Sequence, residues 1–126
     1  MHLAAYAQVD IALDTFPYGG TTTTVEAMMQ GVPVVTLQTP PGADFHACNV
    51  GRSLVSSVGR ADLVASSPDE FVDIASQLAA DPARLRELRG SLRSALLQSP
   101  VGDADTFHRH VDEMWLEMWR SYCAAP

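Results

Sequence analysis

Short apolar runs and a helical pattern alternate along the first third of the chain. Residues 9–13 are apolar apart from one aspartate and predict a buried parallel strand. Residues 22–30 predict a helix that ends at Gly31, and Pro33 prevents its continuation. Residues 33–37 predict a second strand, which completes a strand–helix–strand unit with the right-handed crossover usual for parallel strands.

Helical patterns dominate the remainder of the chain. Residues 44–57 predict a helix broken at Gly51, and residues 62–65 predict a very short third strand. Ser67 and Asp81, each followed by proline, mark the starts of two further helices. A last helix carries one broad apolar face, formed by Phe107, Val111, Met114, Trp115, Met118 and Tyr122.

The order of these elements predicts an α/β fold of Rossmann-like character, with a short parallel sheet, covering helices and a helical C-terminus. Two or three strands leave unpaired edges on the sheet, and such edges need covering. The chain therefore looks like the back half of a larger doubly wound domain. We do not expect it to fold alone as a complete enzyme.

Composition narrows the class of protein. At 126 residues with 47% hydrophobic content, the chain has the size of one globular domain. Fifteen acidic against eight basic residues give a net charge of −7 without any basic run, which argues against nucleic acid and anionic membranes as partners. The sequence contains neither a secretory signal nor a membrane-spanning apolar run. Cys48 and Cys123 are expected to be free thiols, so we expect a cytoplasmic protein.

The most distinctive local feature is the loop Gly19-Gly20 followed by four threonines, between the first strand and the first helix. Adjacent glycines allow a sharp turn and a close approach of the backbone to a ligand. The first turn of a helix offers unpaired N–H groups and a positive dipole end, which suit a phosphate. The loop thus favours a nucleotide diphosphate, although it matches neither the Walker lysine loop nor the spaced-glycine dinucleotide fingerprint. A second interpretation is a capping box, in which Thr23 caps the helix and Glu26 reaches back to it.

Other polar residues offer weaker candidates. Asp14 follows the first strand, where it can support the glycine loop or contact a ligand. His46 precedes a helix and is either a ligand contact or a partly exposed helix-start residue. The acidic pair Asp103 and Asp105 precedes a helix and is interpreted as a helix start, and no metal site is predicted.

An ordered series of segments gives the chain a family resemblance. The segments DIALDTFPY (10–18), GTTTT (20–24) and GVPVVT (31–36) closely resemble the catalytic region of O-linked N-acetylglucosamine transferases and their SPINDLY-like relatives, glycosyltransferase family 41. The similarity continues through HACNVG (46–51) and SPDE (67–70) to the final helix, so it covers essentially the whole chain.

The resemblance implies a GT-B glycosyltransferase, in which two Rossmann-like lobes face each other across a cleft. The carboxyl lobe holds UDP-N-acetylglucosamine, and the sugar is transferred with inversion to a serine or threonine hydroxyl of an acceptor protein. Residues 1–102 would form the later part of that nucleotide-sugar-binding lobe, and residues 103–126 a C-terminal helix packing on it. The amino lobe with the catalytic histidine, and the usual tetratricopeptide repeats, would lie outside this chain.

The resemblance also implies which residues hold the donor. Gly20, Thr21, Thr22 and Thr23 match the loop that contacts the diphosphate. Threonine at the first of the three threonine positions resembles bacterial members, since animal members carry histidine there. Neither a metal nor a cofactor is expected besides the donor substrate, and no catalytic residue is expected within the chain.

Two further positions match the nucleoside site, and two depart from the family pattern. Glu26 matches an acidic residue that binds the ribose hydroxyls, and His2 matches a histidine near the uridine. Gly19 stands where relatives usually have asparagine, and Asn49 where they usually have arginine. Loss of an arginine near an anionic donor would weaken affinity, unless that arginine is structural. The alternatives are therefore a non-catalytic binding remnant of the fold, or a related transferase that uses GDP-fucose or UDP-glucose.

Overall fold

A three-stranded parallel sheet forms the centre of the molecule. The structure is a computed structural model that describes residues 2–39 and 45–124. Strands β1 (Ala12–Leu13), β2 (Val34–Leu37) and β3 (Val64–Ala65) lie in the order β1-β2-β3, with β2 in the middle. The predicted short parallel sheet is therefore confirmed.

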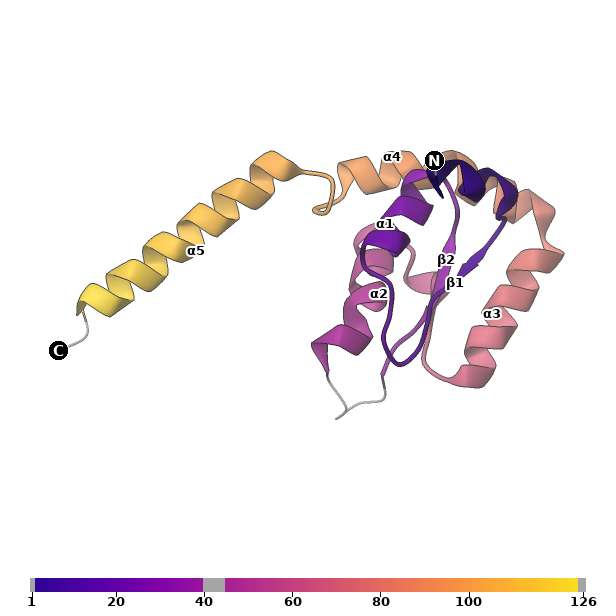
Figure 1. Cartoon of the computed structure of the whole chain (residues 1–126), viewed down its shortest axis with the longest axis horizontal. Helices are drawn as coiled ribbons and strands as arrows, with labels where there is room; N and C mark the ends of the chain where they lie inside the picture. Colours follow the sequence, from indigo (N-terminus) through magenta and orange to yellow (C-terminus); the bar gives the residue numbers. More distant parts are fainter. Residues whose placement is uncertain (1, 40–44, 125–126) are drawn as a thin grey trace.

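Helices cover both faces of the sheet. Helices α1 and α2 lie on one side of it and α3 on the other, while α4 runs across one end (Figure 1). The helical elements are the 3-10 helices η1 (His2–Gln8) and η2 (Ala61–Leu63) and the α-helices α1 (Thr22–Met29), α2 (His46–Ser57), α3 (Pro68–Ala80), α4 (Pro82–Gln98) and α5 (Ala104–Ala124).

The core forms where α1, α3 and α4 meet around β2. Leu88, Leu92 and Leu96 of α4 recur every fourth residue, so they lie on one helix face and are buried together. They pack against residues of α1, α2 and α3 and against the chain leading into β2. The buried cluster includes Ala27, Met28, Val32, Val34, Val55, Leu63, Leu78, Leu88, Leu92 and Leu96.

The predicted helix starts at Ser67 and Asp81 are confirmed. The Ser67 hydroxyl accepts a hydrogen bond from the amide of Glu70, and the Asp81 carboxylate accepts from two amides of α4. Glu70 reaches back to the hydroxyl and amide of Ser66 instead of Ser67, and these bonds hold the pKa of Glu70 below its usual value, the hydroxyl contributing most.

The predictions for the first strand and for α2 need correction. Only Ala12 and Leu13 of the expected strand 9–13 are paired, and the Leu13 side chain is 58% exposed. Within the described part of the chain β1 has a strand on one side only, so it is an edge and not a buried strand. The expected break at Gly51 is absent, because α2 is continuous through that residue and buries it. In the sequence, Pro40-Pro41-Gly42 predicts a loop at 38–43, and this segment lies mostly outside the described residues.

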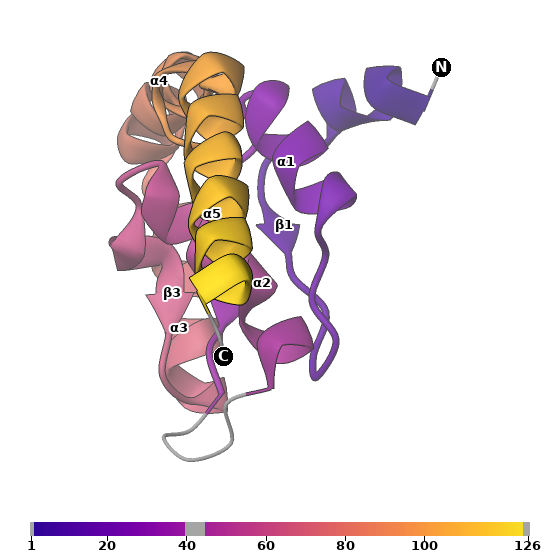
Figure 2. The same ribbon diagram turned by 90° about the vertical axis from the view of Figure 1, so that its left-hand side faces the viewer.

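Helix α5 differs most from expectation. The segment 103–126 was expected to pack on the lobe, yet α5 contains no buried residue and extends away from the sheet (Figure 1). In Figure 2 the same helix comes toward the viewer, in front of the other elements. Trp115 is 68% exposed and Tyr122 is 74% exposed, so most of the apolar face predicted from the sequence is left uncovered by residues 2–39 and 45–124. Across those same ranges, no helix combines the length and apolarity that crossing a membrane requires.

Two glycines with positive φ provide a test of the packing between α1 and α4. Gly31 (φ 76°) and Gly59 (φ 74°) have the same left-handed backbone, but a Cβ on Gly31 would lie 2.6 Å from the carbonyl oxygen of Arg89, whereas Gly59 faces open space. We expect Gly59→Ala to cost only the left-handed strain of about 1–2 kcal/mol. Gly31→Ala should lower the free energy of unfolding further, measured by urea denaturation followed by circular dichroism. Equal losses in the two variants would contradict the packing described here.

Candidate functional site

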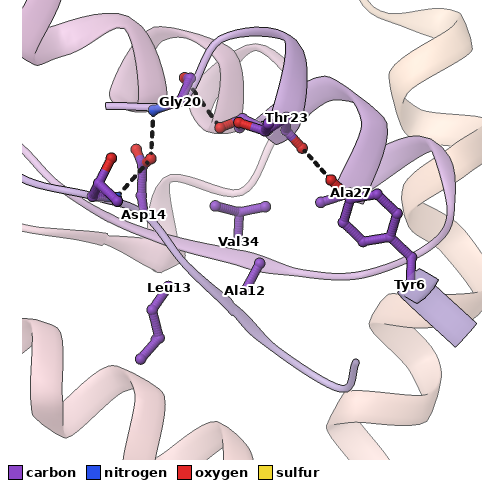
Figure 3. Close-up of a pocket in the computed structure, with 10 residues that line it drawn as sticks. Tyr6, Ala12, Leu13, Asp14, Gly20, Thr23, Ala27 and Val34 are labelled. Atoms are coloured by element: carbon purple, nitrogen blue, oxygen red, sulfur yellow. Dashed lines mark hydrogen bonds between the residues drawn. The ribbon is translucent and has the colours of Figure 1, made fainter. Parts of the chain in front are cut away.

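A cavity of about 140 Å³ opens beside the glycine–threonine loop (Figure 3). Its walls come from β1 and the start of β2, from the first turns of α1 and from Tyr6 of η1. Asp14 directly follows β1, so the polar wall of the cavity lies at the carboxyl end of that strand. This edge is the usual place for ligands in open α/β sheets.

Asp14 is the most connected polar side chain of the site. Its Oδ1 accepts hydrogen bonds from the amide of Gly20 at 2.7 Å and from the amide of Thr15 at 3.0 Å. Its Oδ2 accepts from the hydroxyl of Thr36, in β2, at 2.8 Å. Figure 3 shows the carboxylate between the end of β1 and the backbone at Gly20. One carboxylate thus joins the glycine loop to two strands.

Two glycines lie close against this carboxylate. A Cβ on Gly51 of α2 would lie 2.1 Å from Oδ2 of Asp14 and 2.5 Å from the hydroxyl of Thr36. A Cβ on Gly19 would lie 3.0 Å from the same Oδ2. Helix α2 therefore packs directly on Asp14 through the bare backbone at Gly51.

The start of α1 is not capped by a side chain. Thr21 is the N-cap residue, and its side chain makes no capping hydrogen bond. The predicted capping box of Thr23 and Glu26 is therefore wrong. Thr24 is the one buried threonine of the four, and its hydroxyl donates to the carbonyl of Gly20 at 3.1 Å. Thr21, Thr22 and Thr23 are exposed, so their hydroxyls and the first amides of the helix remain accessible to a ligand.

Glu26 pairs with His2 and not with the backbone amide that the capping box required. Its Oε2 lies 3.1 Å from Nε2 of His2, and the two side chains are 26% and 70% exposed. Element η1 is held beside α1 by this pair and by the Tyr6 hydroxyl, which donates to the carbonyl of Thr23 at 3.3 Å (Figure 3). The fold thus brings together His2 and Glu26, 24 positions apart in sequence, beside the N-terminal half of α1.

The remaining candidates lie apart from this cluster. His46 is the exposed first residue of α2, and within residues 2–39 and 45–124 its side chain makes no hydrogen bond or ion pair. Asn49 donates from Nδ2 to the Thr39 hydroxyl at 2.7 Å and accepts the Thr39 amide at 3.3 Å. Asn49 is therefore a structural link between α2 and the segment after β2.

The described side chains offer no metal centre. Among residues 2–39 and 45–124 no group of three or more histidine, cysteine, aspartate or glutamate side chains is placed to hold an ion. The acidic pair after α4 is a helix start as predicted, because Oδ1 of Asp103 accepts the amide of Thr106 at 3.0 Å. That bond is the main cause that lowers the pKa of Asp103.

Sequence reasoning did not single out two supporting residues, Thr36 and Gly51. Each has a sequence feature that could have identified it. Thr36 is the one hydroxyl residue in an otherwise apolar strand, and Gly51 is a glycine within a helical pattern. The signals were ambiguous, because a glycine in a helix also indicates a break and a threonine is common in strands.

Comparisons with known proteins identify relatives over nearly the whole chain. The model of glycosyl transferase family 41 matches residues 2–111. A rice protein named as a probable UDP-N-acetylglucosamine–peptide N-acetylglucosaminyltransferase SPINDLY is 49% identical over 97% of this chain, and a Caenorhabditis elegans UDP-N-acetylglucosamine–peptide N-acetylglucosaminyltransferase is 27% identical over 96%. These matches cover only 13% and 10% of the two relatives.

A solved structure gives the same result for the fold. An O-GlcNAc transferase mutant from Thermobaculum terrenum superposes with a TM-score of 0.84 at 40% identity, over 97% of this chain and 23% of that chain. The predicted Rossmann-like α/β architecture is thereby confirmed. The chain spans between a tenth and an eighth of the length of the curated relatives named above.

Two helical glycines test the tight packing on Asp14. Gly51→Ala places a methyl group against the carboxylate, and we expect it to lower the free energy of unfolding by about 1–3 kcal/mol through overpacking. Gly90→Ala in α4, where nothing lies within 4 Å, is the matched control. It should raise stability by about 0.5–1 kcal/mol, because alanine favours helix. Both values follow from urea denaturation, and a neutral Gly51→Ala would contradict the geometry.

Proposed function

The chain belongs to glycosyl transferase family 41, and we propose that it forms the nucleotide-sugar-binding part of a protein O-linked N-acetylglucosamine transferase. The observation that carries the proposal is the uncapped first turn of α1, set beside a cavity at the carboxyl end of β1. The names of the relatives support UDP-N-acetylglucosamine as the donor and a peptide as the acceptor.

In this proposal the diphosphate of the donor lies on the glycine–threonine loop. Gly20 allows close approach of the backbone, and Thr21, Thr22 and Thr23 supply exposed hydroxyl donors. The amides and dipole of α1 add a fixed positive potential. Negative charge develops on the diphosphate as the sugar leaves, and donors already aimed at that position stabilise it. This arrangement does not require a metal ion.

The nucleoside would lie beside His2 and Glu26. In the free chain Oε2 of Glu26 is paired with His2, whereas Oε1 has no hydrogen-bond partner among the residues that the structure describes. Oε1 is therefore available to a ribose hydroxyl, and the exposed His2 ring is available to the base. Asp14 and His46 are not assigned direct donor contacts, since Asp14 is occupied by three protein donors and His46 lies outside the cluster.

The remainder of the donor site would come from parts of a longer protein. The cavity of about 140 Å³ is smaller than ligand pockets of about 300–1,000 Å³. In this proposal an amino-terminal lobe, preceded by tetratricopeptide repeats, completes the cleft and supplies the base that activates the acceptor serine or threonine. The exposed apolar face of α5 is consistent with a surface that the longer protein covers.

Calorimetric titration of UDP and GDP against the folded polypeptide tests the donor assignment. We expect UDP to bind, and Thr22→Ala to weaken it by about tenfold or more, because hydrogen bonds to charged groups contribute about 1.5–3 kcal/mol. The melting temperature should not fall, since Thr22 is not the N-cap of α1 and alanine favours helix. Ser94→Ala, an exposed position of α4, is the control and should leave affinity unchanged.

Three other outcomes of this titration would each contradict part of the donor assignment. Binding of GDP in preference to UDP would identify a related transferase with a different donor. Unchanged affinity of Thr22→Ala with a lower melting temperature would give Thr22 a structural role only. Absence of binding by both nucleotides, in a sample shown to be folded, would contradict the donor site in this chain and favour a non-catalytic remnant.

A further inference from the structure

We propose that Asp14 is a positioning residue, which sets the glycine–threonine loop for the diphosphate and does not itself touch the donor. The inference rests on the proposed function, because it assigns a role within that same site. It begins from the three hydrogen bonds of the carboxylate, which join the loop amides of Thr15 and Gly20 to the hydroxyl of Thr36 in β2.

The carboxylate has little capacity left for a ligand. Oδ1 already accepts two amide hydrogens, at 2.7 and 3.0 Å. Oδ2 accepts the Thr36 hydroxyl and faces the bare backbone of two glycines, where a Cβ on Gly51 or Gly19 would lie 2.1 or 3.0 Å away. A direct contact would also place a negative carboxylate against a negative diphosphate, which is unfavourable. The chemistry of Asp14 therefore suits support and not ligand contact.

The hydrogen bonds continue from Asp14 into α1. The amide of Gly20 donates to Asp14, and the carbonyl of Gly20 accepts the buried hydroxyl of Thr24 in the first turn of the helix. Figure 3 shows this sequence of bonds from the end of β1 through Gly20 to the helix. The N–H of Gly20 belongs to the peptide group shared with Gly19 and its C=O to the group shared with Thr21, so the two bonds hold the backbone on both sides of the Gly20 Cα. The position and direction of the first helical amides are therefore tied to β1 and β2 through one carboxylate.

This arrangement predicts an effect confined to the phosphate end of the ligand. The nucleoside contacts proposed for His2 and Glu26 depend on η1 and the outer side of α1. The hydrogen bonds of the Asp14 carboxylate go to Thr15, Gly20 and Thr36 instead. Loss of the Asp14 bonds should thus weaken binding of UDP and leave binding of uridine, which has no phosphate, unchanged. A merely structural role would affect both ligands alike, through the folded fraction.

The test compares Asp14→Asn with Asp10→Asn in the full chain. Both substitutions remove one negative charge, but the Asp10 side chain is exposed and its replacement leaves the loop bonds intact. Dissociation constants for UDP and uridine are measured by ligand-observed NMR, which reaches the millimolar range. We expect Asp14→Asn to weaken UDP by about tenfold, the loss of roughly one charge-assisted hydrogen bond, with uridine within about twofold of wild type. Asp10→Asn should change neither.

A second variant keeps the inference testable where Asp14→Asn does not fold. Thr36→Val has nearly the same shape and removes only the hydroxyl that holds Oδ2, so it should weaken UDP by a smaller factor and again spare uridine. Unchanged UDP affinity in both variants, tighter UDP binding in Asp14→Asn, or equal losses for UDP and uridine would each overturn the inference. Wild-type chain that is folded and binds no UDP would instead overturn the proposed function on which it rests.

Discussion

The carboxylate of Asp14 is the interaction on which the geometry of the site depends. A strand, a loop, a second strand and a helix converge at one point, and each presents either a donor or a bare glycine backbone to this side chain. A partly buried carboxylate is costly unless its oxygens accept hydrogen bonds, and the three donors satisfy it. The same hydrogen bonds also fix the loop, so the bonds that satisfy the buried carboxylate are the bonds that set the conformation of the loop.

Some of the α-helices have a side chain that caps the N-terminus and others do not. The uncapped α-helices are those that follow strands β1 and β2. Helices α3, α4 and α5 are capped by Ser67, Asp81 and Asp103. Helices α1 and α2, which begin where β1 and β2 end, have no side-chain cap. A missing cap costs about 1 kcal/mol, and the cost is offset where a ligand occupies the free amides. The fold thus leaves donors open at the edge of the sheet where ligands of α/β proteins bind.

Local patterns predicted much of this fold. Helix N-caps, glycines that end helices and the spacing of apolar residues each depend on only a few neighbouring residues. Ser67, Asp81 and Gly31 behaved as such signals indicate. The failures arose from contacts distant in sequence. Position 51 takes glycine because α2 packs on Asp14, 37 positions earlier in the sequence. Glu26 pairs with His2, 24 positions earlier, in a helix whose N-cap is Thr21 and not Thr23. The exposure of β1 and of α5 could not be predicted either, since a local apolar pattern does not say which surface will cover it.

The central claim is that the first turn of α1 holds the diphosphate of a nucleotide sugar. Amide chemical shifts of the isotope-labelled chain, recorded during titration with UDP and then with uridine, test it residue by residue. The account predicts that the amides of Gly20, Thr22 and Thr23 shift with UDP and remain in place with uridine. Shifts with UDP that are confined to other elements, with these three amides unmoved, would contradict it.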